Sequence, residues 1–412
     1  MTLTLKTTNT LMTTTRRSRN KMSVRLLTLG LLAAAFCSGC GSLRPRTSVP
    51  ASLVDDAQIP GMPGVRLHLD PATVHKEQID NVLGNAVDRA KKLDRPLTLL
   101  ALSGGGADGA FGAGVLCGWT EKGDRPEFDV VTGISTGALL APFAFLGSKY
   151  DAEMKESYTT ISDKDILKKR GFFGILQYRD AVTSSEPLLK QIEKQIDQAK
   201  IDAIAAEHRK GRRLFVGTSD LDAERVTVWD MGAIAASGNP NARKLFCQVL
   251  LASASIPVAF PPVYFDVEAA GKHYEEMHAD GGVTTQVFGT AFLARLMDKS
   301  GNNQGRLYLV RNSQLRPKWV SVQPKLASIA GRAVGTMIKT QGYGDLYRAY
   351  VIADANHLDY NLAAIPADFS APREGEFDPA FMKVLFNTGY QQARAGYPWS
   401  KAPPGLNSVP AK

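Results

Sequence analysis

The sequence predicts an α/β domain with a doubly wound, mostly parallel central sheet flanked by helices. An apolar run at 97–102 ends in three glycines and is followed by a small-residue helical pattern. A second strand, at 128–132, is likewise followed by a helical pattern at 137–146. Strand and helix signals then keep alternating to about residue 393. This alternation is typical of parallel sheets whose strands are joined by helical crossovers.

The remaining elements follow from hydrophobic periodicity and turn signals. Further strands are predicted at 213–217, 225–229 and 306–311. Further helices are predicted at 78–93, 110–120, 186–196, 242–254, 285–297, 326–338 and 380–393. No internal repeat occurs, so we expect one catalytic domain at 94–396, followed by an irregular Pro-rich tail at 397–412.

The basic charge of the chain is concentrated at its N-terminus. The 412 residues carry a formal net charge of +9, and residues 1–39 hold six Lys and Arg but no acidic residue. Subtracting these six leaves about +3 for the rest, where no basic stripe with interleaved aromatic residues remains. A nucleic-acid partner is therefore not expected.

The N-terminal segment has the pattern of an export signal. Arg25 precedes an apolar stretch at 26–36, and small residues follow up to Cys40. A basic flank, a short apolar core and a small-residue cleavage site define a signal peptide, and this core is shorter than the ~20 residues that span a bilayer. We therefore predict a signal peptide at 1–39, with Met22 as an alternative start. Residues 40–93 are predicted to form a membrane-proximal tether and a short helix.

Ser38-Gly39-Cys40 resembles the lipobox of bacterial lipoproteins, in which the cysteine is acylated and becomes the mature N-terminus. The resemblance implies that Cys40 is a lipid anchor to a membrane surface. It also implies an exported, outer-membrane lipoprotein of a Gram-negative bacterium, facing the periplasm or the cell surface, because Gly41 is not the aspartate that marks inner-membrane retention. Cys37 departs from the aliphatic residue usual at its position, and an ordinary secretory signal is the alternative.

The other cysteines and the histidines do not indicate a metal site. Cys117 and Cys247 lie in apolar helical patterns, which predicts core packing, with one disulfide as the alternative. The six histidines are scattered and show no metal-ligand spacing. No metal and no cofactor are expected.

The glycine-rich loop after the first strand has several interpretations. Gly104, Gly106 and Gly109 match the dinucleotide pattern G-x-G-x-x-G at the start of a helix. That site also needs an acidic residue at the C-terminal end of the next strand, whereas Asp129 stands at its beginning. A Walker-type loop is disfavoured because no Gly-Lys-Ser/Thr follows. A plain strand–helix turn is the remaining alternative.

The pentapeptide GISTG, at 133–137, is a G-x-S-x-G nucleophile elbow between a strand and a helix. Such a turn would project Ser135 above the strand end, over the N-terminus of the following helix, whose N–H groups favour a developing anion. Neighbouring parallel strands end at the same edge of a sheet. The glycine loop would therefore lie beside Ser135 and bind an oxyanion.

A serine hydroxyl needs a base to become a nucleophile. Asp280 is the best candidate, because Gly281-Gly282 after it let the backbone turn tightly and aim the carboxylate. His278 and His357 are the alternatives for a Ser–His–Asp triad. The tripeptide at 280–282 is also compatible with a simple turn.

These segments together resemble the patatin-like phospholipases, serine lipid acyl hydrolases that use a Ser–Asp dyad. SGGGADG, at 103–109, resembles their oxyanion motif, GISTG their elbow and DGG their dyad aspartate; residues 252–263 resemble the segment ahead of that aspartate. The resemblance implies that Ser135 and Asp280 are catalytic. It also implies a lipid ester or phospholipid substrate and no cofactor. The residues it implies for the oxyanion hole are Gly104, Gly105 and Gly106.

Two further features bear on the function. Asp108 stands where many members of the family have Arg or Lys, and a catalytically silent surface lipoprotein that binds lipid or acts as a scaffold is the alternative function. Residues 167–178 set three cations beside aromatic and aliphatic side chains. This segment would contact a membrane or an acyl groove, or else pack on the core with a solvated basic edge.

Overall fold

The computed structural model describes residues 46–69, 76–169, 181, 183–289 and 305–406. The predicted signal peptide, the anchor candidate Cys40 and most of the basic-aromatic segment at 167–178 lie outside these residues. The predictions made for them therefore stay predictions.

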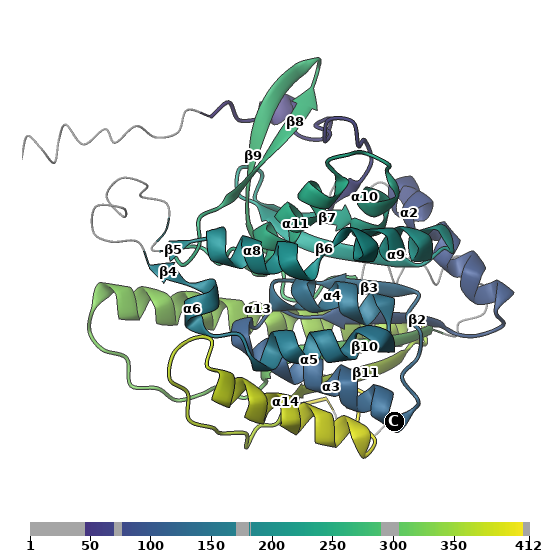
Figure 1. The fold of residues 1–412 in the computed structure, drawn as a ribbon. Helices are drawn as coiled ribbons and strands as arrows, with labels where there is room; N and C mark the ends of the chain where they lie inside the picture. The colour runs from purple at the N-terminus through teal and green to yellow at the C-terminus, as the bar shows by residue number, and fades with distance from the viewer. Residues whose placement is uncertain (1–45, 70–75, 170–180, 182, 290–304, 407–412) are drawn as a thin grey trace, which may run out of the picture. The chain divides into compact units, whose positions relative to one another are not determined.

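A nine-stranded mixed sheet runs through the described residues (Figure 1). Its strands are β1 (Arg66–Leu69), β2 (Leu97–Leu102), β3 (Val130–Gly133), β6 (Arg213–Asp220), β7 (Arg225–Asp230), β8 (Val263–Ala269), β9 (Lys272–Asp280), β10 (Gly305–Gln314) and β11 (Asp359–Ile365). The order is β1-β7-β6-β3-β2-β10-β11, while β9 pairs with β6 and with β8. The strands β6, β3, β2, β10 and β11 are mutually parallel. The predicted mostly parallel sheet is confirmed.

Helices join and cover these strands. They are α2 (Lys76–Lys92), α3 (Gly109–Lys122), α4 (Thr136–Leu146), α5 (Asp151–Thr159), α6 (Asp163–Ile166), α8 (Glu186–Gln195), α9 (Gln198–Arg209), α10 (Met231–Ala236), α11 (Ala242–Ser253), α13 (Leu326–Ala355) and α14 (Pro379–Arg394). Two short strands, β4 (Lys168–Lys169) and β5 (Thr183–Ser184), form a separate ribbon. None of the helices in the described residues combines the length and apolar composition that crossing a bilayer requires.

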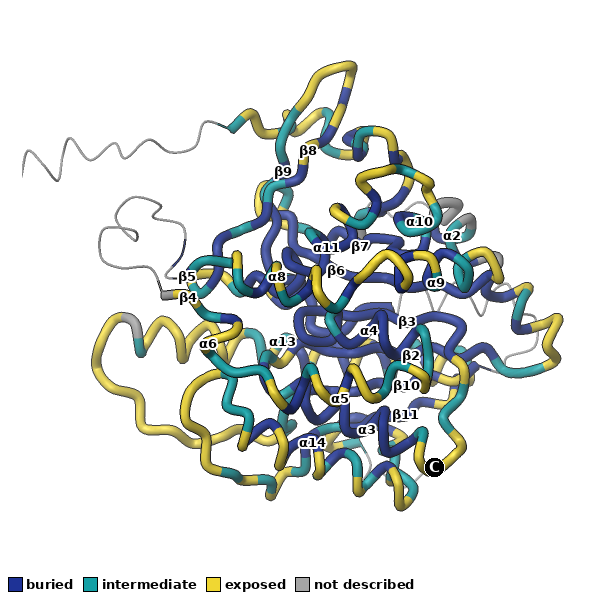
Figure 2. Tube along the Cα trace, viewed as in Figure 1, coloured by how far each residue is buried: buried dark blue, intermediate teal, exposed yellow. Residues whose placement is uncertain are grey.

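Alternate residues of the parallel strands enter two separate cores, one on each face of the sheet. Leu100 and Leu102 of β2 pack with side chains of α3, α4, α11 and α14. Leu99 and Ala101 pack on the opposite face with α2 and the C-terminal half of α13. Figure 2 shows these central strands buried along their length. Helices on both faces of a parallel sheet bury it completely, which is why β2 reads as an apolar run rather than as an alternating pattern.

The segment predicted as a tether packs on this domain from residue 46 onward. Ala57, Ile59 and Met62 are buried in the larger core, and the backbone of Gln58 pairs with that of Glu268. Strand β1 then adds to the edge of the sheet beside β7. The structural domain therefore begins well before residue 94, because a few apolar residues among prolines and glycines suffice to fix the segment.

Two helix predictions need correction. Residues 285–289, part of the helix predicted at 285–297, form an irregular segment, because the Asp345 carboxylate accepts hydrogen bonds from the N–H groups of Gln286 and Val287. The helix predicted at 326–338 continues to Ala355.

The predicted irregular tail also packs on the domain. Ser400 exchanges backbone hydrogen bonds with Leu362 of β11, and the Trp399 ring lies against Trp119 of α3 at a centroid distance of 4.8 Å. Aromatic side chains thus fix a Pro-rich segment that hydrophobic periodicity does not reveal. Cys117 and Cys247 are both buried and unpaired, as expected of core residues.

Candidate active site

Ser135 occupies a strained turn between β3 and α4. Its backbone has φ 54° and ψ −125°, a conformation that costs a residue with a side chain about 1–3 kcal/mol. The flanking glycines permit the turn: a Cβ at Gly133 would lie 2.4 Å from the Gly137 carbonyl oxygen, and one at Gly137 would lie 2.3 Å from that of Leu102. The local geometry is that of the predicted nucleophile elbow.

The glycine loop that follows β2 lies beside this serine. A Cβ built on Gly104 would stand 3.2 Å from Ser135 Cβ, so the loop and the turn are in direct contact. A Cβ on Gly105 would fall 2.2 Å from the Asn312 carbonyl oxygen, which leaves room for glycine alone. Gly106 has a positive φ of 57°. The N–H groups of Gly104 and Gly105 donate no hydrogen bond to any described residue, so they are available for an anion.

Asn312, at the end of β10, holds the glycine loop in place. Its backbone N–H donates to Ser103 Oγ at 2.8 Å and its side-chain Nδ2 to the Ser103 carbonyl at 2.8 Å. Its Oδ1 accepts from the Gly112 N–H of α3 at 3.1 Å. Asn312 is fully buried. The sequence analysis missed this residue, because its position opposite Ser103 depends on the pairing of β10 with β2.

Asp280 ends β9 and meets the elbow from the other side. The backbone of Asp280 pairs with Thr218 of β6. Its Oδ1 accepts a hydrogen bond from the Gly282 N–H at 2.7 Å, while its buried Oδ2 has no hydrogen-bond partner of normal geometry. Burial raises the pKa of Asp280 to about 7, although the nearby Ser135 hydroxyl and the Gly282 amide both lower it. A carboxylate with one free oxygen and a pKa close to neutrality suits a general base.

Ser253 joins the elbow to β6. Its hydroxyl accepts a hydrogen bond from the Ser135 N–H at 3.0 Å and donates to the Gly217 carbonyl at 2.7 Å. The Ser135 amide is therefore already engaged. An oxyanion at this serine would depend on the N–H groups of the glycine loop.

A buried polar network supports the floor of the site. Arg311 Nη1 donates to Gln286 Oε1 at 3.0 Å, and Gln286 Nε2 donates to the Gly282 carbonyl at 3.0 Å. Asp345 of α13 anchors the backbone of Gln286 at 2.7 Å. Burial lowers the pKa of Arg311 to about 10. This network connects α13 to the turn that carries Asp280, and no sequence motif marks it.

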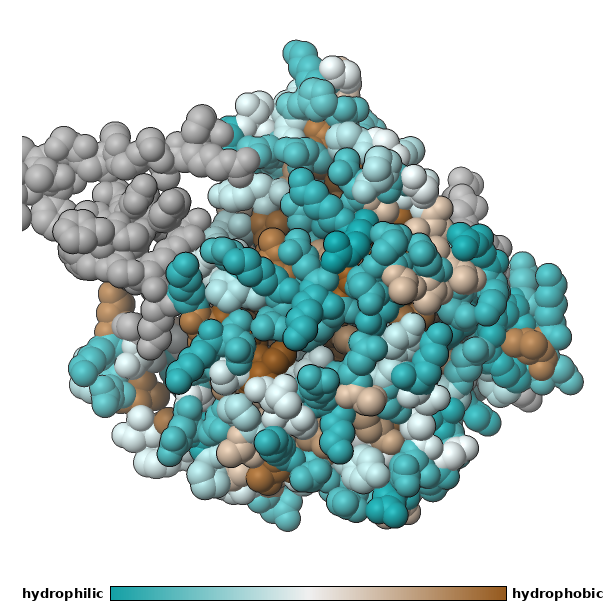
Figure 3. Space-filling view, viewed as in Figure 1, coloured by the Kyte–Doolittle hydropathy of each residue, from teal (hydrophilic) through white to brown (hydrophobic). Residues whose placement is uncertain are grey.

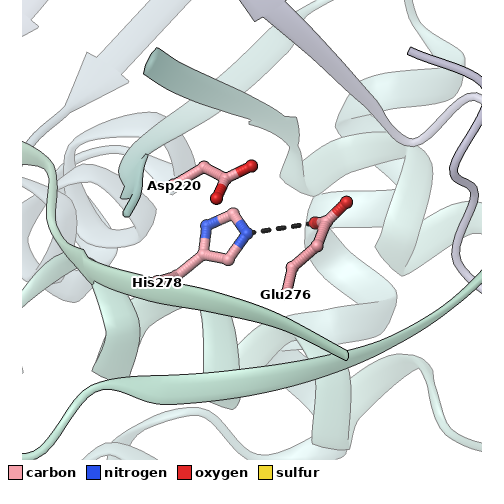
Figure 4. A group of neighbouring side chains, drawn as sticks. All are labelled: Asp220, Glu276 and His278. Atoms are coloured by element: carbon pink, nitrogen blue, oxygen red, sulfur yellow. Dashed lines mark hydrogen bonds and ion pairs between the residues drawn. The ribbon is translucent and has the colours of Figure 1, made fainter. Parts of the chain in front are cut away.

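His278 belongs to a separate buried cluster. Its Nδ1 lies 2.9 Å from Thr218 Oγ1. Its Nε2 lies 3.1 Å from Glu276 Oε2 (Figure 4). Arg66 bonds both Glu276 oxygens. Burial alone would raise the pKa of Glu276, but His278 and Arg66 lower it to about 2. Both ring nitrogens of His278 are engaged, so the structure does not place it as the base for Ser135.

The same cluster includes Asp220. One carboxylate oxygen of Asp220, one of Glu276 and a ring nitrogen of His278 all lie within 4.8 Å of one another. The cluster does not fit a metal ion. Both carboxylate oxygens of Glu276 are used by the Arg66 guanidinium, whose charge also opposes a cation. Glu276 and His278 are instead hydrogen-bonded to each other. Asp220 accepts from the N–H groups of Asp222 and Ala223.

We expect His278→Ala to reduce stability while sparing activity. The change opens a cavity and removes a partner of the Glu276 carboxylate, which should lower the free energy of unfolding by about 2–4 kcal/mol. Turnover of a soluble ester per folded molecule should stay within about 3-fold of the unchanged protein, because the ring touches neither Ser135 nor Asp280. Denaturant titration and steady-state kinetics check both values. A folded variant without activity would favour a triad.

His357 is the matched comparison for that variant. It is exposed in the turn before β11, and β11 runs parallel to β3. It therefore lies at the edge of the sheet opposite the elbow. We expect His357→Ala to change neither stability nor turnover.

Asp108 is paired with a cation from a distant segment. Arg373 Nη1 lies 3.4 Å from Asp108 Oδ1, and the same guanidinium pairs with Glu376 Oε1 at 2.9 Å. Burial raises the pKa of Asp108 to about 6, while Arg373 lowers it. Where many patatin-like sequences have Arg or Lys, this chain thus has an aspartate with Arg373 beside it.

A mostly parallel sheet with a strained serine turn at the carboxyl edge of its strands defines an α/β fold of the nucleophile-elbow type. Within that class, residues 100–288 match the model of the patatin-like phospholipase family. This stretch is 189 of the 412 residues and contains both Ser135 and Asp280.

The chain is also similar to individual proteins of known sequence or structure. Patatin group M-2 of Solanum tuberosum is 23% identical over 221 residues, which cover 50% of this chain and 54% of the potato protein. The chain thus spans about half the length of that curated relative. The structure of VipD from Legionella pneumophila matches with a TM-score of 0.36 and 13% identity, over 73% of this chain and 66% of that one.

Proposed function

We propose that this protein is a lipid acyl hydrolase that uses Ser135 as nucleophile and Asp280 as general base. The observation that supports this most strongly is the unpartnered Oδ2 of the buried Asp280, next to a serine held in a strained turn. Burying a carboxylate oxygen without a hydrogen-bond partner destabilises the folded protein. Such a group is therefore expected to serve a function. Its pKa of about 7 allows it to take and return a proton near neutral pH.

The reaction would proceed through an acyl-enzyme. Asp280 takes the proton of the Ser135 hydroxyl as Oγ attacks the ester carbonyl, and passes that proton to the leaving alcohol. Water then attacks the acyl-enzyme, giving a proton to Asp280, and the released Ser135 oxygen takes that proton back as the fatty acid leaves. One residue can serve both half-reactions because its pKa lies close to the working pH.

The oxyanion would be bound by the N–H groups of Gly104, Gly105 and Gly106. Each donor of such a hole contributes on the order of 10²–10³ in rate. The N-terminus of α4 beneath Ser135 adds a favourable partial charge.

The acyl chain has a candidate pocket beside the glycine loop. It is lined by Gly106, Thr136, Leu139, Ile192, Phe377 and Met382, among others, and its volume is about 50 Å³. Its apolar lining suits a hydrocarbon chain. The volume is about one third of the ~150 Å³ cavity that holds benzene in an engineered protein. We therefore propose that short acyl chains fit the pocket best as it stands. The exported, membrane-anchored location stays a prediction from residues 1–40.

A fluorophosphonate probe tests the proposal against the alternative of a silent lipid-binding or scaffold lipoprotein. Such probes react only with an activated serine, so we expect stoichiometric labelling of Ser135, located by peptide mass spectrometry. Incubation with mixed bacterial lipids should release free fatty acids. Absence of both results would leave the silent module as the better interpretation.

A further inference from the structure

The N-terminal half of α13 and the residues before it carry a concentrated positive charge. We call residues 316–339 the basic arm. Its cations are Arg316, Lys318, Lys325, Arg332 and Lys339, and no Asp or Glu occurs from residue 315 to residue 344. The arm therefore has a net charge of +5, five cations with no acid.

The basic arm also exposes large apolar side chains. Trp319 and Leu326 are each 86% exposed, Met337 is 70% exposed and Ile329 53%. Figure 2 shows the beginning of α13 exposed to solvent, and hydrophobic side chains appear at that edge of the molecule in Figure 3. Apolar side chains gathered on one exposed segment mark an interaction surface. Single exposed leucines scattered over a protein do not.

The arm has a defined shape. Arg332 Nη2 donates to the Lys318 carbonyl at 2.6 Å, and Lys339 Nζ donates to the Arg316 carbonyl. These bonds hold the segment before α13 back against the helix. Trp319 is thereby presented together with the helix rather than on a separate loop.

The arm influences the candidate active site through Lys318, and the part of α13 that follows the arm contacts the floor of that site. Lys318 is one of the charges that lower the pKa of Asp108, next to the glycine loop. Further along α13, a Cβ on Gly342 would lie 2.5 Å from Arg311 Nη2, and Asp345 anchors Gln286. The arm is therefore continuous, through α13, with residues that support the floor of the candidate site.

We propose that the basic arm docks the protein onto an anionic lipid surface. This inference rests on the proposed function, because it states that the protein encounters its lipid substrate as an anionic membrane surface. Lys and Arg attract anionic headgroups, and tryptophan favours the membrane interface. A second copy of the chain is disfavoured as the occupant, because it would bring two arms of +5 together.

Trp319 provides a direct readout of docking. It is the exposed tryptophan of the four, since Trp119 and Trp229 are buried and Trp399 is half-buried. The experiment uses the full chain with Ser135→Ala, so that no lipid is consumed and the result does not depend on hydrolysis. We expect a blue shift of the fluorescence with phosphatidylglycerol vesicles and quenching by brominated acyl chains. Both changes should disappear in Trp319→Phe.

Charge-matched variants test the electrostatic part. Lys318→Gln with Lys325→Gln should weaken vesicle partitioning about 30-fold, at roughly 5-fold per cation near the surface. Lys244→Gln with Lys383→Gln removes two exposed cations elsewhere and should change partitioning less than 3-fold. Phosphatidylcholine vesicles should bind far more weakly than phosphatidylglycerol vesicles.

Three outcomes would overturn the proposal. Vesicle binding without any change at Trp319 would show that another segment contacts the lipid. Equal losses in the two charge variants would show a non-specific effect of net charge. A Trp319 shift that depends on protein concentration and needs no vesicles would instead identify self-association. A failure of hydrolysis alone would contradict the proposed function but not the docking.

Discussion

Ser135→Ala should abolish ester hydrolysis while the protein stays folded. We expect kcat/KM for a p-nitrophenyl ester to fall by at least about 10⁴-fold, the scale on which removal of a nucleophile acts in other serine hydrolases. The fold should persist because the Ser135 hydroxyl faces the Asp280 carboxylate of the candidate site rather than a group that holds the fold together. The positive φ at this position should cost alanine no more than serine, because both carry a single unbranched Cβ.

The measurement needs two comparisons. The melting temperature of Ser135→Ala should match that of the unchanged protein, and labelling by a fluorophosphonate should be lost. Ser148→Ala removes an exposed hydroxyl outside the site and should keep full activity. If Ser135→Ala retained turnover above one hundredth of the original rate, another nucleophile would be at work.

The sequence predicted those parts of the site that a short stretch of backbone determines. The elbow at 133–137 is such a part, because its two glycines are required by contacts with residues close in the chain or on the adjoining strand. The parallel sheet followed from the alternation of apolar strands with helices. The structure brings Ser135, Asp280 and the glycine loop together. Neighbouring predicted strands indicated this for Ser135 and the loop, whereas Asp280 was selected from the two glycines after it and from the family resemblance. Their catalytic roles stay predictions.

Other parts of the structure depend on long-range register and could not be read from local pattern. Asn312 and Ser253 act on the site only through the pairing of β10 with β2 and the packing of α11 on β6. The helix predicted to end at residue 338 continues to Ala355, and Gly342 within it makes room for the Arg311 guanidinium, a contact that depends on packing against β10. Residues 285–289 fit a helix by periodicity, yet the Asp345 carboxylate holds their backbone in an irregular path.

Asp280→Asn should be nearly as damaging to activity as Ser135→Ala. Asparagine keeps an oxygen that can accept from the Gly282 N–H but cannot take a proton from Ser135. We expect kcat/KM to fall by about 10³–10⁴-fold. In the unchanged protein, kcat/KM should rise with pH and level off above about 7, since only the ionised carboxylate acts as a base.

The same substitution should make the protein more stable at alkaline pH. The folded-state pKa of Asp280 is about 7, whereas an unfolded aspartate titrates near ~3.9. Between these values the folded state binds more protons than the unfolded state, so the ionisation of Asp280 lowers stability as pH rises, by about 4 kcal/mol once pH exceeds 7. Asparagine has no such ionisation. The free energy of unfolding of Asp280→Asn should exceed that of the unchanged protein by up to this amount at pH 8, and by almost nothing at pH 4.

Denaturant titrations at several pH values separate this effect from a general change in packing. Asp266→Asn removes an exposed carboxylate and should alter neither activity nor the pH dependence of stability appreciably. If the free energy of unfolding of Asp280→Asn exceeds that of the unchanged protein by an amount that grows from pH 4 to pH 8, burial of the carboxylate destabilises the folded state. Such a cost is expected of a group kept for chemistry. A stability difference that stays constant with pH would contradict the raised pKa and, with it, the assignment of Asp280 as a base poised near neutrality.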